Sequence, residues 1–241
     1  MSCSPGLVAD VVHFSWVDGP GNRFVVFLQG CTFDCIACHN PQTIHPRCVL
    51  ARSVWPDELV EELRPLAPYL AGVTMSGGEA TMQAPFVEDV FSRIKGDADL
   101  AALTTFVDTN GDASRDVWDA LVPVMDGAMV DLKALDPELH RTLTGNDNAQ
   151  VLDSIRHLAG VDRLYEVRLL LVPGVNDDRA TLERTAAWLL AVDPAMRVKL
   201  IGFRRHGVRR PGREWREASD DERAAYVDVL RDAGVGRLEL V

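Results

Sequence analysis

The chain has 241 residues, of which 47% are hydrophobic and 25% charged, and its net charge is −11. This length suits one α/β domain, and so acidic a surface opposes nucleic-acid binding, which needs a basic face. No apolar run reaches the roughly 18 residues that span a bilayer, and the first residues lack the pattern of a secretory signal, so we expect a cytoplasmic monomer that binds neither nucleic acid nor membrane.

Short apolar segments alternate with amphipathic segments along the chain. Strands are predicted at Arg23–Leu28, Gly72–Met75, Thr104–Val107, Ala128–Val130, Glu166–Val172 and Arg197–Phe203, with a terminal strand at Arg237–Val241. Helices are predicted at Pro56–Leu70, Pro85–Lys95, Ser114–Val122, Asn148–Ala159, Arg179–Val192 and about Asp220–Ala233. This alternation indicates βαβ units and a parallel sheet. Because such crossovers are right-handed, six units would curl into a partial (β/α)6 TIM-like barrel.

Polar residues and glycines follow the predicted strands. In chain order they are Gly30 with three cysteines, Ser76–Glu79, Asp108–Gly111, Asp131–Lys133, Pro173–Gly174 and Arg204–His206. Barrel active sites form at the C-terminal ends of the strands. Chance explains one or two such placements but not a succession of six, so we predict a cofactor site at this end.

Five cysteines are present, and three of them, Cys31, Cys35 and Cys38, fall within eight residues. In a reducing compartment such a cluster indicates metal ligation rather than disulfides. Structural zinc needs four ligands. His39 could be the fourth but is adjacent to Cys38, which makes joint tetrahedral ligation awkward, and Cys48 is another candidate. Three thiolates also suit a 4Fe–4S cube with one open iron that binds a substrate and passes it an electron. The spacing alone leaves both metals open.

The segment Gln29–Asn40, which contains the triplet, resembles the cluster motif of radical S-adenosylmethionine (SAM) enzymes. The preceding Val17–Arg23 looks like a motif of one branch, the glycyl-radical enzyme activases. The resemblance continues through Ser76–Glu79, Asp108–Gly111, Asp131–Lys133, His140–Gly145 and Arg168–Gly174. It implies a single radical SAM domain over residues 1–241, with a cluster loop at 30–40 and a C-terminal cap region at about 204–241, and it disfavours zinc.

The resemblance also implies an activity. In this family a 4Fe–4S cluster reductively cleaves SAM to methionine and a 5′-deoxyadenosyl radical. The radical takes a hydrogen atom from a glycine of a partner glycyl-radical enzyme, which is thereby activated under anaerobic conditions. The implied cofactors are one 4Fe–4S cluster, SAM and a monovalent cation, and no catalytic residue is expected beyond the cluster and the cofactor.

The matching positions carry the family's binding roles. Cys31, Cys35 and Cys38 are implied to ligate the cluster. The implied cofactor contacts are Ala37, His39, Gly77, Gly78, Glu79, Asp108, Thr109, Met129, Asp131, Lys133, Arg168 and Arg204. Asp108 and Asp131, with Thr109 and the carbonyl of Met129, match the cation site. From the residues alone, the glycines also suit a plain turn, the two aspartates helix N-caps and Lys133 a solvated surface.

The chain departs from the best-known member, the pyruvate formate-lyase activator, after the sixth predicted strand. There a histidine of that enzyme contacts adenine, and here Arg204 stands in register, whereas a shift of two residues would substitute His206. This tail, with Gly78–Thr81 and Asp126–Met129, looks closer to a less-studied activase subgroup. The ferredoxin-like insert that this subgroup often carries is absent, so we expect an external flavodoxin or ferredoxin as electron donor and Cys48 as a buried free thiol. The basic stretch Arg204–Arg213 is expected to be a solvated loop.

Two alternatives remain open at this point. One is a radical SAM enzyme that acts on a small molecule, like a carboxy-deazaguanine synthase. The other is a non-catalytic electron carrier or zinc-stabilised binding module. The segments Asp108–Gly111 and Asp131–Lys133 favour the activase, although the sequence does not name its partner enzyme.

Overall fold

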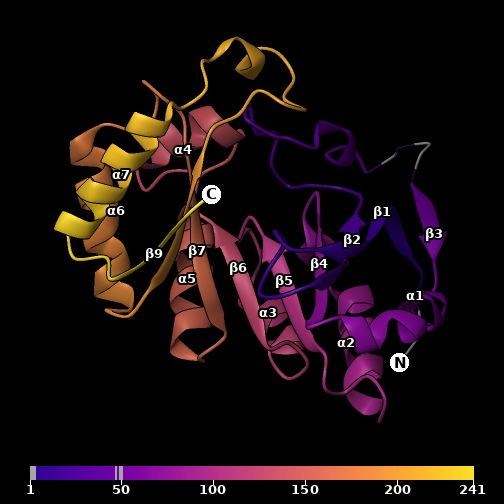
Figure 1. Cartoon of the computed structure of the whole chain (residues 1–241). Helices are drawn as coiled ribbons and strands as arrows, with labels where there is room; N and C mark the ends of the chain where they lie inside the picture. The colour runs from indigo at the N-terminus through magenta and orange to yellow at the C-terminus, as the bar shows by residue number, and fades with distance from the viewer. Residues whose placement is uncertain (1–3, 47, 49–50) are drawn as a thin grey trace. The chain divides into compact units, whose positions relative to one another are not determined.

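The computed structural model describes residues 4–46, 48 and 51–241 (Figure 1). Its strands are β1 (Gly6–Ser15), β2 (Arg23–Leu28), β3 (Arg52–Val54), β4 (Gly72–Gly77), β5 (Thr104–Thr109), β6 (Gly127–Asp131), β7 (Leu164–Leu171), β8 (Arg197–Gly202) and β9 (Arg237–Leu240). Its α-helices are α1 (Pro56–Leu63), α2 (Ala84–Gly96), α3 (Arg115–Leu121), α4 (Pro137–Thr144), α5 (Ala149–Gly160), α6 (Arg179–Val192) and α7 (Asp220–Asp232). The strand order is β3-β1-β2-β4-β5-β6-β7-β8-β9.

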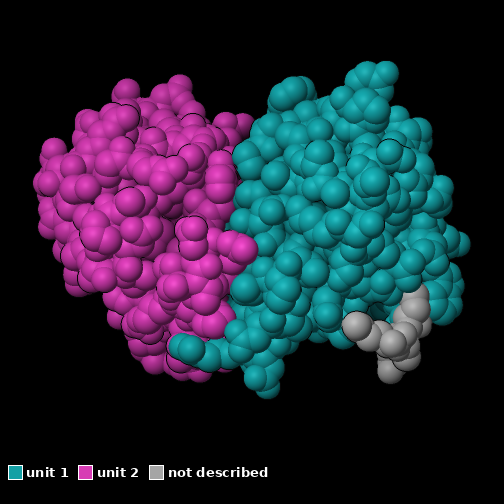
Figure 2. Space-filling model, turned by 90° about the horizontal axis from the view of Figure 1, so that it is seen from below, with its two compact units in different colours: residues 1–32, 42–129 teal, residues 33–41, 130–241 magenta. Residues whose placement is uncertain are grey.

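The chain forms two compact units (Figure 2). Unit 1 comprises residues 1–32 and 42–129, and unit 2 comprises residues 33–41 and 130–241. The predicted cluster loop, 30–40, therefore contributes residues to both units, as does β6. The prediction of one radical SAM domain stays a prediction.

Unit 1 combines a parallel and an antiparallel part. Strands β2, β4 and β5 are parallel, with Arg23 opposite Gly72 and Gly72 opposite Thr104. Their side chains are almost all buried, as expected of parallel strands covered on both faces. Strand β1 pairs antiparallel with both β2 and β3. Helix α2 packs beside α1 and α3.

Unit 2 continues the parallel pattern. Strands β7, β8 and β9 are parallel neighbours, with Val167 opposite Val198 and Val198 opposite Leu238. Helices α6 and α7 pack against each other and α5 packs on β7 (Figure 1). Buried leucines such as Leu182, Leu189 and Leu230 line the core faces of α6 and α7. No helix among the described residues is long and apolar enough to cross a membrane.

The structure confirms each predicted strand within a few residues and corrects the prediction at four elements. Strands β1 and β3 and helix α4 were not predicted. The predicted helix Pro56–Leu70 ends at Leu63 and continues as a 3-10 helix, Arg64–Tyr69. That segment contains two prolines, which lack the backbone N–H that an α-helix needs.

Candidate functional site

The segment Ser76–Glu79, which spans the end of β4 and the turn after it and is called the glycine loop below, is built on glycine backbone. Gly77 has a φ of 119°, and a Cβ there would lie 2.1 Å from the Leu28 nitrogen. A Cβ on Gly78 would lie 2.1 Å from the Gly30 carbonyl oxygen. Both positions require glycine because the loop packs directly on the backbone that follows β2. The space beside each missing side chain is thus filled by protein, and the predicted cofactor contact stays a prediction.

Glu79 holds this loop from the interior of unit 1. Its side chain is 0% exposed and accepts hydrogen bonds from the Thr81 nitrogen and hydroxyl, the Thr109 hydroxyl and the Asn110 nitrogen, at 2.6–2.9 Å. Its own nitrogen donates to the Gly30 carbonyl at 2.7 Å. Burial raises the pKa of the Glu79 carboxyl, and the four hydrogen bonds act in the opposite direction. Glu79 therefore joins three segments of unit 1: its carboxylate binds those at the ends of β4 and β5, and its backbone nitrogen binds the one after β2.

The first cysteine of the triplet is fixed in unit 1 by hydrogen bonds. The Cys31 nitrogen donates to the Ile44 carbonyl at 3.0 Å. The side-chain amide of Asn110 donates to the Cys31 sulfur at 3.7 Å and to the Thr32 hydroxyl at 3.1 Å. Hydrogen bonds to cysteine sulfur tune the potential of a bound iron–sulfur cluster. Asn110 is a candidate site residue that we did not predict, although it lies inside the Asp108–Gly111 motif.

Asp108 faces the glycine loop and caps no helix. Its carboxylate accepts a hydrogen bond from the Ser76 hydroxyl at 2.8 Å. Helix α3 begins after Ser114, so the N-cap alternative for Asp108 is wrong. Met129, whose carbonyl belongs to the predicted cation site, is buried in β6. The geometry leaves the Asp108 carboxylate at the C-terminal end of β5, as predicted.

In unit 2 the other two cysteines lie on the loop of residues 33–41, called the cysteine loop below. This loop is anchored to α4. The nitrogens of Asp34 and Ile36 donate to carbonyls in the last turn of α4 at 2.8 and 2.9 Å. Cys35 and Cys38 are free thiols of intermediate exposure. Burial raises the pKa of the Cys35 thiol to about 11 and also raises that of Cys38, while the Lys133 charge lowers both. Metal binding must then displace these protons.

Asp131 and Lys133 form an ion pair at the end of β6. The Lys133 ammonium lies 2.6 Å from the Asp131 carboxylate. Asp136, not Asp131, caps α4, so the N-cap alternative for Asp131 is also wrong. Burial lowers the pKa of Lys133, but Asp131 and the neighbouring Cys35 outweigh it and the net shift is upward. Lys133 is therefore a positive charge beside the cysteine loop, not a solvated surface lysine.

Arg168 is buried in β7 and has a partner within its own strand. Its Nε lies 2.8 Å from the Glu166 carboxylate, and both side chains are buried. An unpaired arginine is costly to bury, and this ion pair offsets that cost. Asn176 is a second residue that the sequence reasoning missed. Its amide donates to the carbonyls of Leu170 and Lys133 at 2.9 and 3.0 Å, which ties the ends of β6 and β7 together.

The imidazole of His39 contacts the backbone of Arg204. The His39 Nε2 forms a 2.9 Å hydrogen bond with the Arg204 carbonyl, and the imidazole stacks on Phe203 with 6.5 Å between ring centroids. Ala37 packs in the same buried apolar cluster as Phe203. The side chains of Arg204 and His206 are both exposed, and the adenine contact stays a prediction for each.

The three cysteines of the triplet are free thiols of intermediate exposure. Among the described residues, no three histidine, cysteine or acidic side chains gather as they would around a single metal ion. Cys48 is a free cysteine that is partly exposed, not buried as expected. Cys3 lies outside the described residues.

Comparison with known proteins identifies the superfamily of the chain and proteins of similar fold. The radical SAM superfamily profile matches residues 25–189. The fold is similar to a radical SAM methyltransferase of Sphaerobacter thermophilus, with a TM-score of 0.69 and 20% identity, over 91% of this chain and 66% of that one. A domain of a pyruvate-formate lyase-activating enzyme from Bacteroides vulgatus has a TM-score of 0.58 and 23% identity, over 71% and 99%. These likenesses confirm the predicted fold class.

Proteins of similar sequence identify the family within this superfamily. The chain is 32% identical to the pyruvate formate-lyase-activating enzyme of Staphylococcus aureus, over 92% of this chain and 94% of that enzyme. It is also 32% identical to the enzyme of that name from Staphylococcus epidermidis, over 84% and 83%. The chain belongs to the radical SAM superfamily and, within it, to the family of the pyruvate formate-lyase-activating enzymes. Membership implies a 4Fe–4S cluster and SAM as cofactors.

Proposed function

We propose that the protein is an oxidoreductase that activates a glycyl-radical enzyme. The observation that carries this proposal is the Cys31, Cys35 and Cys38 triplet of free thiols in a chain 32% identical to pyruvate formate-lyase-activating enzymes. When bound, the cluster and SAM supply a one-electron reductive cleavage whose 5′-deoxyadenosyl radical takes a hydrogen atom from a glycine of the partner. We propose a cytoplasmic, single-domain monomer that takes its electron from a flavodoxin or ferredoxin.

The chain's own residues bind and orient. The three cysteines hold the cluster once their thiols lose protons, and the Asn110 amide donates to the Cys31 sulfur. Glu79 fixes the backbone of the glycine loop, so Gly77 and Gly78 present a rigid edge to the cofactor. The apolar cluster around Ala37 and Phe203 excludes water beside the cysteine loop.

Charged residues complete the proposed cofactor site. Asp108, Thr109, the Met129 carbonyl and Asp131 would hold a monovalent cation beside the cofactor carboxylate, which offsets the crowding of negative charge. The Thr109 oxygen already serves Glu79 and Gly111, so it would give the cation a remaining lone pair. The other proposed cofactor contacts are His39, Lys133, Arg168 and Arg204.

The test is anaerobic reconstitution with iron and sulfide, followed by dithionite, SAM and an assay for 5′-deoxyadenosine. Formation of 5′-deoxyadenosine, and then of a glycyl radical detected by EPR in added pyruvate formate-lyase or another glycyl-radical enzyme, would support the proposal. Product without a radical in any such enzyme would favour the small-molecule alternative. Failure to form a cluster would return the triplet to zinc.

A further inference from the structure

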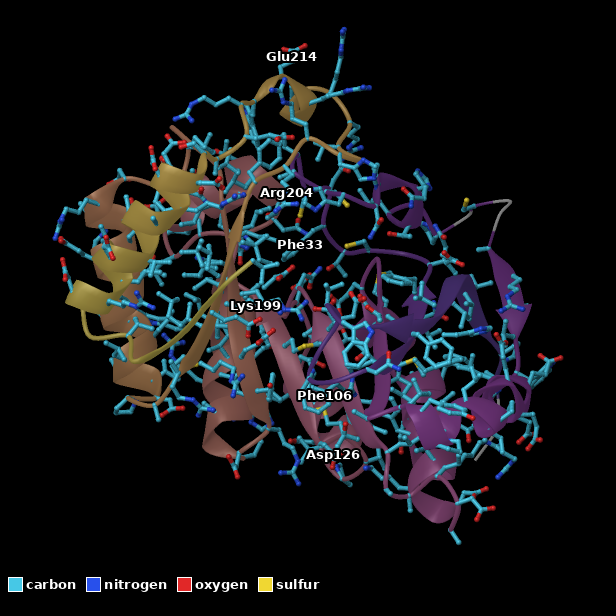
Figure 3. The ribbon with its side chains drawn as sticks, in the orientation of Figure 1. Phe33, Phe106, Asp126, Lys199, Arg204 and Glu214 are labelled. Atoms are coloured by element: carbon cyan, nitrogen blue, oxygen red, sulfur yellow. The ribbon has the colours of Figure 1, made fainter. Side chains whose placement is uncertain are left out.

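The segment Arg204–Arg213 opposes the charge of the rest of the molecule. It holds five arginines, one histidine and no acidic residue in a chain of net charge −11. All six basic side chains are exposed. Figure 3 shows Arg204 just after β8, at the start of this segment, and Glu214, the residue that directly follows the segment. Such a concentration of exposed positive charge favours binding of an acidic partner.

The basic segment is packed onto the loop that carries two of the cysteines. A Cβ added at Gly207 would lie 2.3 Å from the His39 carbonyl oxygen, and one at Gly212 would lie 2.4 Å from that of Ile36. Val208 is buried with Ala37 in one apolar cluster. Backbone therefore meets backbone along the cysteine loop, and the exposed arginines are held around Cys35 and Cys38.

Most arginines of this segment form no strong ion pair with other described residues. Arg209 pairs with Asp34 on the cysteine loop. Arg210 lies 3.8 Å from Glu214, but both side chains are mostly exposed, so the pair is weak. Among the described residues no ion pair involves Arg205 or Arg213. The side chains of Arg205, Arg210 and Arg213 are therefore available to a partner.

We infer that Arg204–Arg213 is the docking surface for a small acidic electron-carrier protein. The inference rests on the proposed function, because only a redox-active cluster on Cys31, Cys35 and Cys38 needs a donor. One electron leaves the reduced carrier, which is oxidised by one electron, and the bound cluster is reduced by one electron, with no bond or proton transferred. Donor complexes of this kind have small, transient interfaces whose association rate is set by charge complementarity.

The test compares two triple variants with the same change in net charge. The loop variant carries Arg205→Gln, Arg210→Gln and Arg213→Gln. The control carries Arg184→Gln, Arg231→Gln and Arg237→Gln, exposed positions on α6, α7 and β9. The probe is a bacterial flavodoxin. The Kd of its oxidised form is measured by calorimetry, and cluster reduction by its reduced form is measured by stopped flow, at low and high salt.

We expect the loop variant to weaken flavodoxin binding and slow cluster reduction at least about tenfold at low salt. The difference should shrink at high salt because screening shortens the range of the charges. The control variant and the dithionite-driven formation of 5′-deoxyadenosine should stay at the wild-type level. Arg204 is left unchanged because it is a proposed cofactor contact.

Three results would overturn the inference. An equal loss in both triple variants would mean that only net charge matters. A loss of the dithionite-driven reaction would mean that the arginines act on the cluster or on SAM. Unchanged flavodoxin binding with slower glycyl-radical formation would assign the surface to the partner enzyme. Failure of the proposed function is distinguishable, because wild-type protein would then form no 5′-deoxyadenosine with dithionite.

Discussion

The two loops that carry the candidate site are held in place in opposite ways. In unit 1 the glycine loop Ser76–Glu79 is fixed from inside, by a fully buried carboxylate with four hydrogen bonds. In unit 2 the cysteine loop is fixed by backbone hydrogen bonds to α4 and by an exposed basic segment that packs over it. Its main side-chain link, Asp34 with Arg209, has side chains 65% and 41% exposed.

This difference in anchoring predicts which substitutions each loop tolerates. Buried polar groups are costly to leave unsatisfied, so residue identity is constrained in the glycine loop. Exposed ion pairs contribute little because water and salt screen them. The cysteine loop should therefore depend on its metal ligands and its packing rather than on its surface charges.

The largest expected effect is that of Cys35→Ala. Removing one of three thiolates leaves too few ligands for a cube with one open iron, so we expect loss of the bound cluster and of all 5′-deoxyadenosine formation. Iron and sulfide analysis after reconstitution measures the first effect. Cys48→Ala, which removes a free cysteine outside the triplet, is the control and should retain full iron. A full iron complement in Cys35→Ala would contradict the assignment.

Gly78→Ala tests the packing of the glycine loop. The new Cβ would meet the Gly30 carbonyl oxygen at 2.1 Å, so backbone must shift and unfolding free energy should fall by about 1–3 kcal/mol or more. SAM binding should weaken as well. Gly160→Ala meets no atom within 4 Å and should change stability by only about 0.5 kcal/mol. Denaturant unfolding compares the two, and equal stability in both variants would refute this account.

Glu79→Gln tests the internal anchor. Glutamine presents an NH2 group to at least one of four hydrogen-bond donors, and the unsatisfied donor should cost about 1–3 kcal/mol of unfolding free energy. The glycine loop should also become more exposed to hydrogen exchange. Glu138→Gln, on the exposed side of α4, is the matched control. A Glu79→Gln protein as stable as that control would show that the carboxylate does not hold the loop.

Asp131→Ala separates cofactor binding from folding. We expect SAM affinity to fall about tenfold, which corresponds to about 1.4 kcal/mol, while iron content stays unchanged. Asp136→Ala removes a true helix cap and should cost about 0.5–2 kcal/mol of stability without a change in SAM affinity. Calorimetric titration with SAM measures both variants. Unchanged affinity in Asp131→Ala would remove this residue from the proposed cation site.

The smallest expected effect is that of Arg209→Gln. It breaks the exposed pair with Asp34 and should cost less than about 1 kcal/mol of unfolding free energy, with cluster binding retained. Thermal unfolding at low and high salt is the measurement. A loss as large as that of Glu79→Gln would show that the two loops are anchored with equal strength and would break the comparison.

Much of the fold could be predicted because its signals are local. Strand β2 is apolar from Phe24 to Leu28 and has its predicted bounds. Helix α6 also has its predicted bounds. Helix α4 was missed although Asp136, Pro137 and Gly145 mark its two ends. Strand β1 was missed because Asp10 and His13 interrupt its apolar pattern.

The sequence by itself determined that metal-ligating cysteines and polar strand ends are present, and the resemblance of these segments to radical SAM motifs implied the class of chemistry. Only the tertiary structure decided why Gly77 and Gly78 are glycines, which side chain holds the Cys31 sulfur and what the basic segment covers. The physical reason is that ligand type and spacing are properties of a short segment. Contacts such as Asn110 with Cys31, or Gly207 with His39, join residues far apart in the chain and exist only after the strands have been ordered.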